Sequence, residues 1–210
     1  MKSENLNSSY LWHCRLGHVS DKRVSKLHKQ GDLGSFDYES YDTCESCLKG
    51  KMSKSPFNKK GEHAKETLEL IHSDVCGPMS RGGYLYFVTF IDDYSRYGYV
   101  YLMKYKSETF EKFKEFKAEV EKQLGKSIKT LRSDRGGEYL SQEFQSYLRD
   151  NGILSQWTPP YTPQHNGVSE RRNRTLLDMV HSMMSDSELP KSFWGYALET
   201  VVYMLNKVLS

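Results

Sequence analysis

The chain has 210 residues, of which 37% are hydrophobic and 13% aromatic, and its formal net charge is +3. This length supports one large domain or two small ones with a buried core, and the aromatic content excludes a disordered chain. The longest apolar-rich run, residues 84–91, is too short to cross a bilayer, and the polar N-terminus lacks a signal sequence. We therefore expect a soluble intracellular protein without membrane contact.

The first part of the chain carries two pairs of metal-binding residue types. Four residues separate His13 from His18, and two residues separate Cys44 from Cys47. Two imidazoles and two thiolates suit a tetrahedral Zn²⁺ ion. A unit this small cannot bury a sufficient core, so the metal would supply its folding energy. The residues between the two pairs predict a helix that ends at Gly31.

Other roles for the cysteines stay open at this point. Cys44 and Cys47 could form a redox pair or be plain buried thiols, although no βαβ pattern surrounds them. Cys14, next to His13, could compete as a ligand, but we expect it to be an ordinary side chain, like Cys76. Because no secretory signal is present, we expect all four cysteines to be reduced and free of disulfides.

A lysine-rich stretch follows the second pair. It lacks periodic hydrophobic residues, and its composition predicts a basic linker at 51–66 between a zinc-binding domain at 1–50 and a larger domain at 67–210. Its lysines could contact nucleic-acid phosphates or simply be solvated. The lysines that we expect to bind nucleic acid are Lys49, Lys51 and Lys54.

The larger domain begins with β-type patterns and ends with helical ones. Strands are predicted at 68–75, 84–93, 97–105, 128–134 and 153–158. Helices are predicted at 110–124 and 141–152, from about 168, and from about 192. This order fits a mixed five-stranded α/β sheet with helices on both faces, and it resembles the ribonuclease-H-like fold.

Three carboxylates in this domain are candidates for a second metal site. Asp74 would lie on the first strand, Asp134 at the end of the fourth, and Glu170 about three residues into a helix. Three acids that converge in space can hold two divalent cations around a phosphodiester. The spacing alone is weak support, because the chain has 27 acidic residues. The nearby acids that we expect to be structural are Asp92, Asp93 and Glu138.

Basic and aromatic residues lie near these acids. Asn173 and Arg174 follow Glu170 by three and four residues, so a helix places them on the same face. With Arg171, they could grip phosphates beside the metal site. The aromatic residues near the preceding loop could stack on bases or pack in the core, and they are Trp157, Tyr161 and His165. We expect Trp194 to be a core residue.

The chain resembles the integrase part of a copia-type long-terminal-repeat retrotransposon polyprotein. The resemblance covers almost all of residues 11–210. It is carried by LWHCRLGH (11–18), CESCLKGK (44–51), HSDVCGP (72–78), FIDDYSRYGYVYLMKYKSE (90–108), LRSDRGGEY (131–139), TPPYTPQHNGVSERRNRTLLDMVHSMM (158–184) and LPKSFWGYAL (189–198).

This resemblance implies a pre-integrase zinc domain followed by a catalytic core of the Asp-Asp-Glu polynucleotidyl transferases. Asp74, Asp134 and Glu170 would be the Mg²⁺ or Mn²⁺ ligands, with Asp74 bridging two ions. The implied reactions are trimming of the 3′ ends of the element DNA and attack of the new 3′-hydroxyl on target DNA. The implied partners are both DNAs and further copies of the chain, with the nucleus as the place of action.

Two rival functions stay open. The first is a non-catalytic nucleic-acid-binding remnant of a transposable element, and the second is a ribonuclease-H-like nuclease for RNA–DNA hybrids. Integrases of this family continue into a DNA-binding region after the core, whereas this sequence ends at Ser210 within an amphipathic helix. We therefore expect impaired strand transfer. The separate Met1 favours a genomic remnant.

Overall fold

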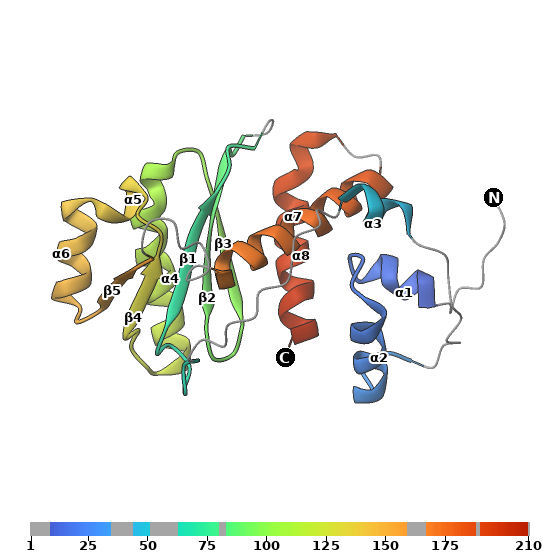
Figure 1. The fold of residues 1–210 in the computed structure, drawn as a ribbon, viewed down its shortest axis with the longest axis horizontal. Helices are drawn as coiled ribbons and strands as arrows, with labels where there is room; N and C mark the ends of the chain where they lie inside the picture. Colours follow the sequence, from blue (N-terminus) through green and yellow to red (C-terminus); the bar gives the residue numbers. More distant parts are fainter. Residues whose placement is uncertain are drawn as a thin grey trace. The chain divides into compact units, whose positions relative to one another are not determined.

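The structure is a computed structural model that describes residues 9–34, 44–50, 63–79, 83–158, 167–187 and 190–209 (Figure 1). Its contacts separate two compact units. The first holds the described residues of Met1–Ser55 and Thr175–Val208, and the second holds those of Pro56–Arg174 together with Leu209. Helix α7 (Gly167–Ser187) therefore gives its first two turns to the second unit and the rest to the first.

The second unit is built on the predicted five-stranded sheet. Its strands are β1 (Ile71–Cys76), β2 (Tyr86–Asp92), β3 (Gly98–Met103), β4 (Thr130–Ser133) and β5 (Leu154–Trp157). The spatial order is β3-β2-β1-β4-β5. The first three strands pair antiparallel, whereas β4 pairs parallel with both β1 and β5. The predicted mixed sheet and the adjacency of the first and fourth strands are confirmed.

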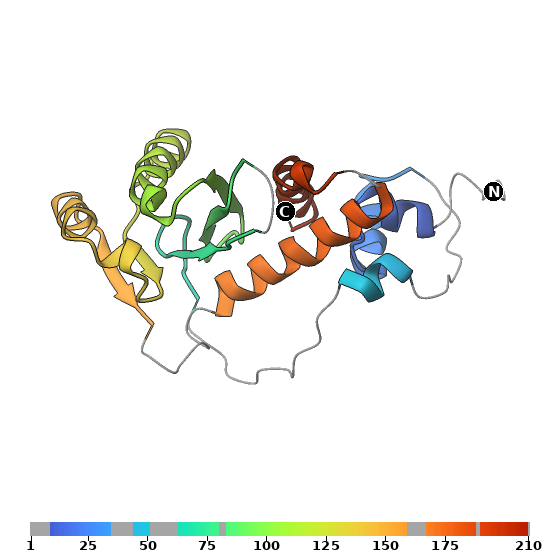
Figure 2. The same cartoon turned by 90° about the horizontal axis from the view of Figure 1, so that it is seen from above.

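One face of the sheet carries the main core. Period-two alternation sends Ile71 of β1 and Val88 and Phe90 of β2 to this face. Helix α4 (Thr109–Leu124) covers this face (Figure 2). It contributes Phe113 and Phe116, and Phe116 stacks on Phe90 with 4.6 Å between ring centroids. Burial of these aromatic rings supplies much of the stabilisation of this unit.

Helix α4 ends where the sequence predicts. Gly125 terminates it in the left-handed conformation, with φ +62°. Leu124, the last residue of the helix, is 47% exposed.

Two further helices follow β4. Helix α6 (Gln142–Asp150) lies within the predicted helix at 141–152, and Ser141 caps it, since the Ser141 hydroxyl accepts a hydrogen bond from the Phe144 amide at 3.3 Å. The four-residue helix α5 (Gly137–Leu140) is absent from the predicted elements because it is too short to show helical periodicity. Its Tyr139 is fully buried, and its hydroxyl lies 2.7 Å from the hydroxyl of Ser73 on β1.

The first unit is helical. It contains α1 (Ser9–Arg15), α2 (Asp21–Gln30), α3 (Glu45–Gly50), the later part of α7, and α8 (Trp194–Leu209). The predicted helix that ends at Gly31 is α2, and Gly31 has φ +84°. Trp194 is buried, as expected, and its neighbour Phe193 precedes α8 and is 43% exposed. None of the helices in the described parts of the chain has the length and apolarity needed to cross a membrane.

Asp92 and Asp93 at the end of β2, which we expect to be structural, both accept hydrogen bonds from neighbouring segments. Asp92 accepts hydrogen bonds from the backbone amides of Leu68 at 2.8 Å and Ser95 at 2.7 Å. The Asp93 side chain is 3% exposed and accepts from His72 Nε2 at 2.8 Å. Such buried carboxylates are held by their donors and are not free to bind a cation.

Asp93 also fixes the segment that precedes β1. Its Oδ2 accepts from the Ala64 amide at 2.7 Å, and its Oδ1 lies 3.2 Å from Arg96 Nη1. Burial favours the protonated acid, but these contacts and the bond from His72 outweigh it, so the pKa of Asp93 lies well below its usual value. Burial also lowers the pKa of His72, which therefore donates as a neutral imidazole.

Replacing Asp93 by asparagine is expected to destabilise the protein by about 3 kcal/mol at pH 7, because one neutral oxygen must replace a charged acceptor of several donors. The depressed pKa makes this contribution present above the unfolded-state pKa near 4 and lost at lower pH. Urea unfolding at pH 7 and at pH 3 measures it. Asp150→Asn, on the exposed end of α6, is the matched control, and equal stability of the two variants at pH 7 would contradict the expectation.

Candidate active site and metal centre

Asp74 and Asp134 lie on one face of the sheet at the same level. The parallel pairs Ile71↔Leu131 and His72↔Arg132 fix the register of β1 against β4. Carried further along both strands, this register sets Asp74 of β1 opposite Asp134, directly after β4. Because side chains alternate along strands, both acids point to the face opposite the aromatic core. The sheet register thus brings together two acids that are far apart in the sequence.

Helix α7 brings Glu170 and Asn173 to the same place. The Asn173 amide donates a hydrogen bond to Asp74 Oδ2 at 2.9 Å. Asn173 is 4% exposed, and its Oδ1 has no hydrogen-bond partner in the described part of the chain. The sequence predicts that Asn173 binds nucleic acid, but its burial against Asp74 favours a role in the carboxylate site instead. The sequence feature that points to this role is the position of Asn173 one helical turn after Glu170.

The pKa of Asp74 reflects its burial and the nearby acidic side chains. Burial and the neighbouring charges of Asp134 and Glu170 raise its pKa, the Asn173 bond partly opposes the shift, and the net pKa is about 7 instead of 3.8. A cation would relieve both the repulsion and the cost of burial. The three carboxylates and the unpartnered Asn173 oxygen are the hard oxygen donors that Mg²⁺ prefers, so the residues present fit such an ion.

The donor atoms of the three acids are spaced more widely than those of a compact metal cluster. Two groups of three or more described ligand residues have donor atoms within 4.8 Å of one another, and the Asp-Asp-Glu set is not among them. Asp134 is held instead by its own loop, where its Oδ1 accepts from the Gly136 amide at 3.0 Å.

The raised pKa of Asp74 predicts an unusual pH dependence for the metal-free protein. Because the folded-state pKa exceeds the unfolded one, ionising Asp74 costs stability as pH rises from about 4 to about 7. Asp74→Asn is therefore expected to raise the unfolding free energy by about 2–4 kcal/mol at pH 8 and to have no effect at pH 3.5. Thermal unfolding in chelator across this range tests it. If stability changed with pH in the same way for the variant and the wild type, the expectation would be contradicted.

The residues predicted to contact nucleic acid differ in exposure, and several of them lie outside the described residues. Arg171 is exposed, and its Nε donates to the Gly167 carbonyl at 2.8 Å, while Arg174 is half-buried. Lys51, Lys54, Tyr161 and His165 lie outside the described residues, as does the side chain of Lys49. Trp157, on β5, is 43% exposed. Nucleic-acid binding by these side chains stays a prediction.

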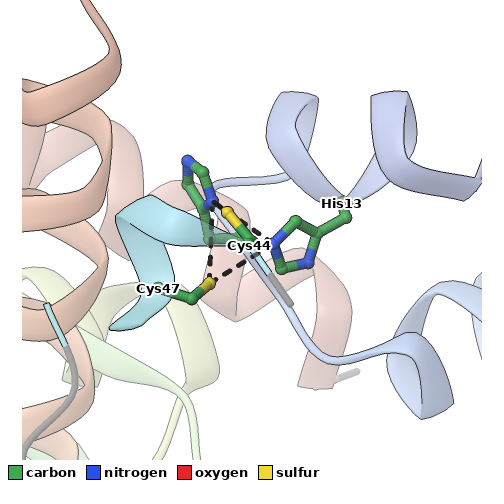
Figure 3. A group of neighbouring side chains, drawn as sticks. His13, Cys44 and Cys47 are labelled. Atoms are coloured by element: carbon green, nitrogen blue, oxygen red, sulfur yellow. Dashed lines mark hydrogen bonds between the residues drawn. The ribbon is translucent and has the colours of Figure 1, made fainter. Parts of the chain in front are cut away.

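The first unit contains a second cluster, made of His13, His18, Cys44 and Cys47. All four are buried, and their donor atoms lie within 4.8 Å of one another. Figure 3 shows His13 and the two sulfur atoms converging from α1 and from α3 with its preceding residue. The left-handed turn at Gly17 and His18, with φ values of +68° and +61°, returns the chain so that both histidines reach the cluster.

The spacing of the donor atoms fits a tetrahedral ion. His13 Nε2 lies 3.3 Å from His18 Nδ1 and 3.3 Å from Cys47 Sγ, and His18 Nδ1 lies 3.4 Å from Cys44 Sγ. Zinc bond lengths place tetrahedral nitrogens about 3.4 Å apart and nitrogen and sulfur about 3.6 Å apart. His13 Nδ1 donates to the Val19 carbonyl at 2.7 Å, which orients Nε2 toward the other cluster atoms. The residues present therefore fit zinc.

Cys14 lies beside this cluster without joining it. It forms a separate group with His18 and Asp186. Burial raises the pKa of the Cys14 thiol to about 11, so it is protonated at neutral pH. Asp186, whose Oδ2 is 2.9 Å from His18 Nε2, has no sequence pattern that links it to the cluster.

Comparison with known proteins gives two family matches. Residues 64–163 match the integrase core domain, and residues 1–52 match the GAG-pre-integrase domain. The retrovirus-related Pol polyprotein from transposon TNT 1-94 of Nicotiana tabacum is 46% identical over 200 residues, which are 94% of this chain and 15% of that polyprotein. The corresponding polyprotein from transposon RE1 of Arabidopsis thaliana is 34% identical over 94% of this chain and 14% of its own length. The chain thus spans about one seventh of these relatives.

The fold also has a counterpart among solved structures. A chain in the cryoEM structure of the simian T-cell lymphotropic virus intasome with PP2A regulatory subunit B56 gamma aligns with a TM-score of 0.57. The identity is 20%, and the alignment covers 90% of this chain and 62% of that one, so the likeness concerns the fold alone. The sheet order and both family matches agree with the predicted ribonuclease-H-like architecture. The chain therefore carries a GAG-pre-integrase domain followed by an integrase core domain, and its predicted resemblance to copia-type long-terminal-repeat retrotransposon integrases is confirmed.

Proposed function

We propose that this chain supplies the catalytic core of a retrotransposon integrase, an Asp-Asp-Glu polynucleotidyl transferase that processes element DNA ends and joins them to target DNA. The observation that carries the proposal is the position of Asp74 and Asp134 at one level of adjacent parallel strands, with Glu170 and Asn173 of α7 beside them. The family matches support the same activity, which belongs to the much longer relatives as whole proteins.

The roles of the residues follow from their positions. Asp74, Asp134 and Glu170 would hold two Mg²⁺ or Mn²⁺ ions, with Asp74 as the shared ligand between them. These ions would supply an activated water or 3′-hydroxyl and stabilise the leaving oxygen. Asn173 fixes Asp74 by holding Oδ2, so the carboxylate keeps one orientation.

The basic side chains that follow Glu170 would then position the DNA. Arg171 is exposed in the first turns of α7, where its guanidinium can form bidentate hydrogen bonds with a phosphate. Assembly of several copies on the two DNA ends, and action in the nucleus, are part of the proposal. The zinc cluster would stabilise the first unit by holding its helices to the loop that carries His18.

A nicking assay tests this function against its two rivals. The chain is incubated with supercoiled plasmid, or with an RNA–DNA hybrid, in Mg²⁺ or in chelator. We expect Mg²⁺-dependent nicking of the plasmid and no cleavage of the hybrid. DNA binding without nicking would favour the non-catalytic remnant, and cleavage of the hybrid alone would favour a ribonuclease-H-like nuclease. Either of these outcomes overturns the proposal.

A further inference from the structure

His18 uses its two ring nitrogens for two different partners. Nδ1 faces the cluster, 3.4 Å from Cys44 Sγ, while Nε2 lies 2.9 Å from Asp186 Oδ2. The His18 side chain is only 2% exposed, and its backbone has φ +61°, which non-glycine residues rarely adopt. A histidine held in this way cannot easily turn its ring, so the partner of Nε2 decides which nitrogen meets a metal.

Asp186 occupies a position that helix electrostatics disfavour. It is the second-last residue of α7, where the negative pole of the helix macrodipole disfavours an acid. The carboxylate is compensated by two contacts from the N-terminal part of the chain, His18 Nε2 and the Ser46 hydroxyl. Both contacts converge on the metal cluster, since Ser46 lies between Cys44 and Cys47.

Other contacts tie the same stretch of α7 to the cluster. The Ser182 hydroxyl donates to the Ser46 carbonyl at 3.2 Å. Gly17, directly before His18, lies against Met179, and a Cβ on Gly17 would come within 2.9 Å of the Met179 Cε atom. The later part of α7 therefore contacts both segments that carry metal ligands, the turn at Gly17 and His18 and helix α3.

We propose that Asp186 is a positioning residue for the zinc site. Its carboxylate accepts the Nε2 proton of His18, fixes the tautomer with a lone pair on Nδ1, and orients that nitrogen toward the metal. The metal domain is then incomplete within residues 1–50 and requires the later part of α7. This inference rests on the proposed zinc site and adds a residue outside the GAG-pre-integrase match at 1–52.

Asp186 could alternatively be a direct ligand, because Cys14, His18 and Asp186 form a group of their own. The two roles differ in stoichiometry. A positioning residue leaves one ion per chain in both wild type and variant, at different affinities. A direct ligand in a second site gives two ions in the wild type and one in the variant.

The test uses the full chain, loaded with zinc and titrated with a competing chelator. Asp186→Asn and Asp186→Ala are expected to weaken zinc binding about 10- to 100-fold while one ion per chain still binds. Glu199→Gln, an equal loss of charge on the exposed face of α8, is expected to leave the affinity unchanged.

A second comparison separates positioning from packing. His18→Cys would give a Cys₃His site, which binds zinc without an imidazole for Asp186 to orient. In that background Asp186→Asn is expected to change zinc affinity less than twofold. An equal loss in both backgrounds, an unchanged affinity in the wild-type background, or a drop from two ions to one would overturn the inference. If wild type binds no zinc, the zinc-site proposal itself fails, which is a distinguishable result.

Discussion

Asp134→Asn is expected to reduce Mg²⁺-dependent DNA nicking on the order of 10³-fold, equivalent to about 4 kcal/mol of transition-state stabilisation. The substitution removes one charged oxygen ligand from a site that already concentrates three acids. It should leave the fold intact, because an asparagine oxygen can still accept the 3.0 Å hydrogen bond from the Gly136 amide. Initial nicking rates of supercoiled plasmid, measured over a range of Mg²⁺ concentrations, test the expectation.

The control for this experiment is Asp150→Asn, the same chemical change on the exposed end of α6. It should nick at the wild-type rate. Partial recovery of Asp134→Asn at high Mn²⁺ would agree with a lost metal ligand, since Mn²⁺ also takes oxygen ligands. Nicking at equal rates by wild type and Asp134→Asn would show that this carboxylate does not take part in the reaction, and it would point to a contaminating nuclease.

Removal of zinc is expected to have the largest effect on stability. Structural zinc sites of this ligand type contribute about 10–16 kcal/mol of apparent binding free energy at neutral pH. Without the ion, four buried polar side chains would face one another with no cation to hold them. Treatment with a strong chelator should therefore abolish the folded state of α1 to α3, detectable as lost helical circular dichroism, and zinc should restore it.

Cysteine variants provide the controls for zinc removal. Cys47→Ser should lose the stoichiometric zinc, whereas Cys76→Ser, on β1 of the other unit, should keep it. Cys14→Ser tests whether the neighbouring thiol competes as a ligand, and we expect one bound ion in this variant too. Zinc affinity should fall on acidification, because protons compete for the same ligand atoms. An unchanged spectrum and stability after complete zinc removal would contradict the structural role.

Much of the fold is readable from local patterns. The five strands and the helices α2, α4, α6, α7 and α8 follow from hydrophobic periodicity, and Gly31 and Gly125 mark helix ends because glycine adopts positive φ at little cost. Short helices cannot be predicted from hydrophobic periodicity. Helices α1, α3 and α5 have four to seven residues, too few to display a period of 3.6.

The sequence by itself determined the kinds of chemistry available, namely two histidines and two cysteines at zinc-like spacing, and acids placed at the ends of strands and at the start of a helix. These features are local, so residue type and spacing carry them. Only the tertiary structure decided which groups share a site. The register of β1 on β4 sets Asp74 level with Asp134, the packing of α7 turns Asn173 onto Asp74, and Asp186 reaches His18 from a distant part of the sequence. Such contacts depend on how whole elements pack, and no short stretch of sequence encodes them.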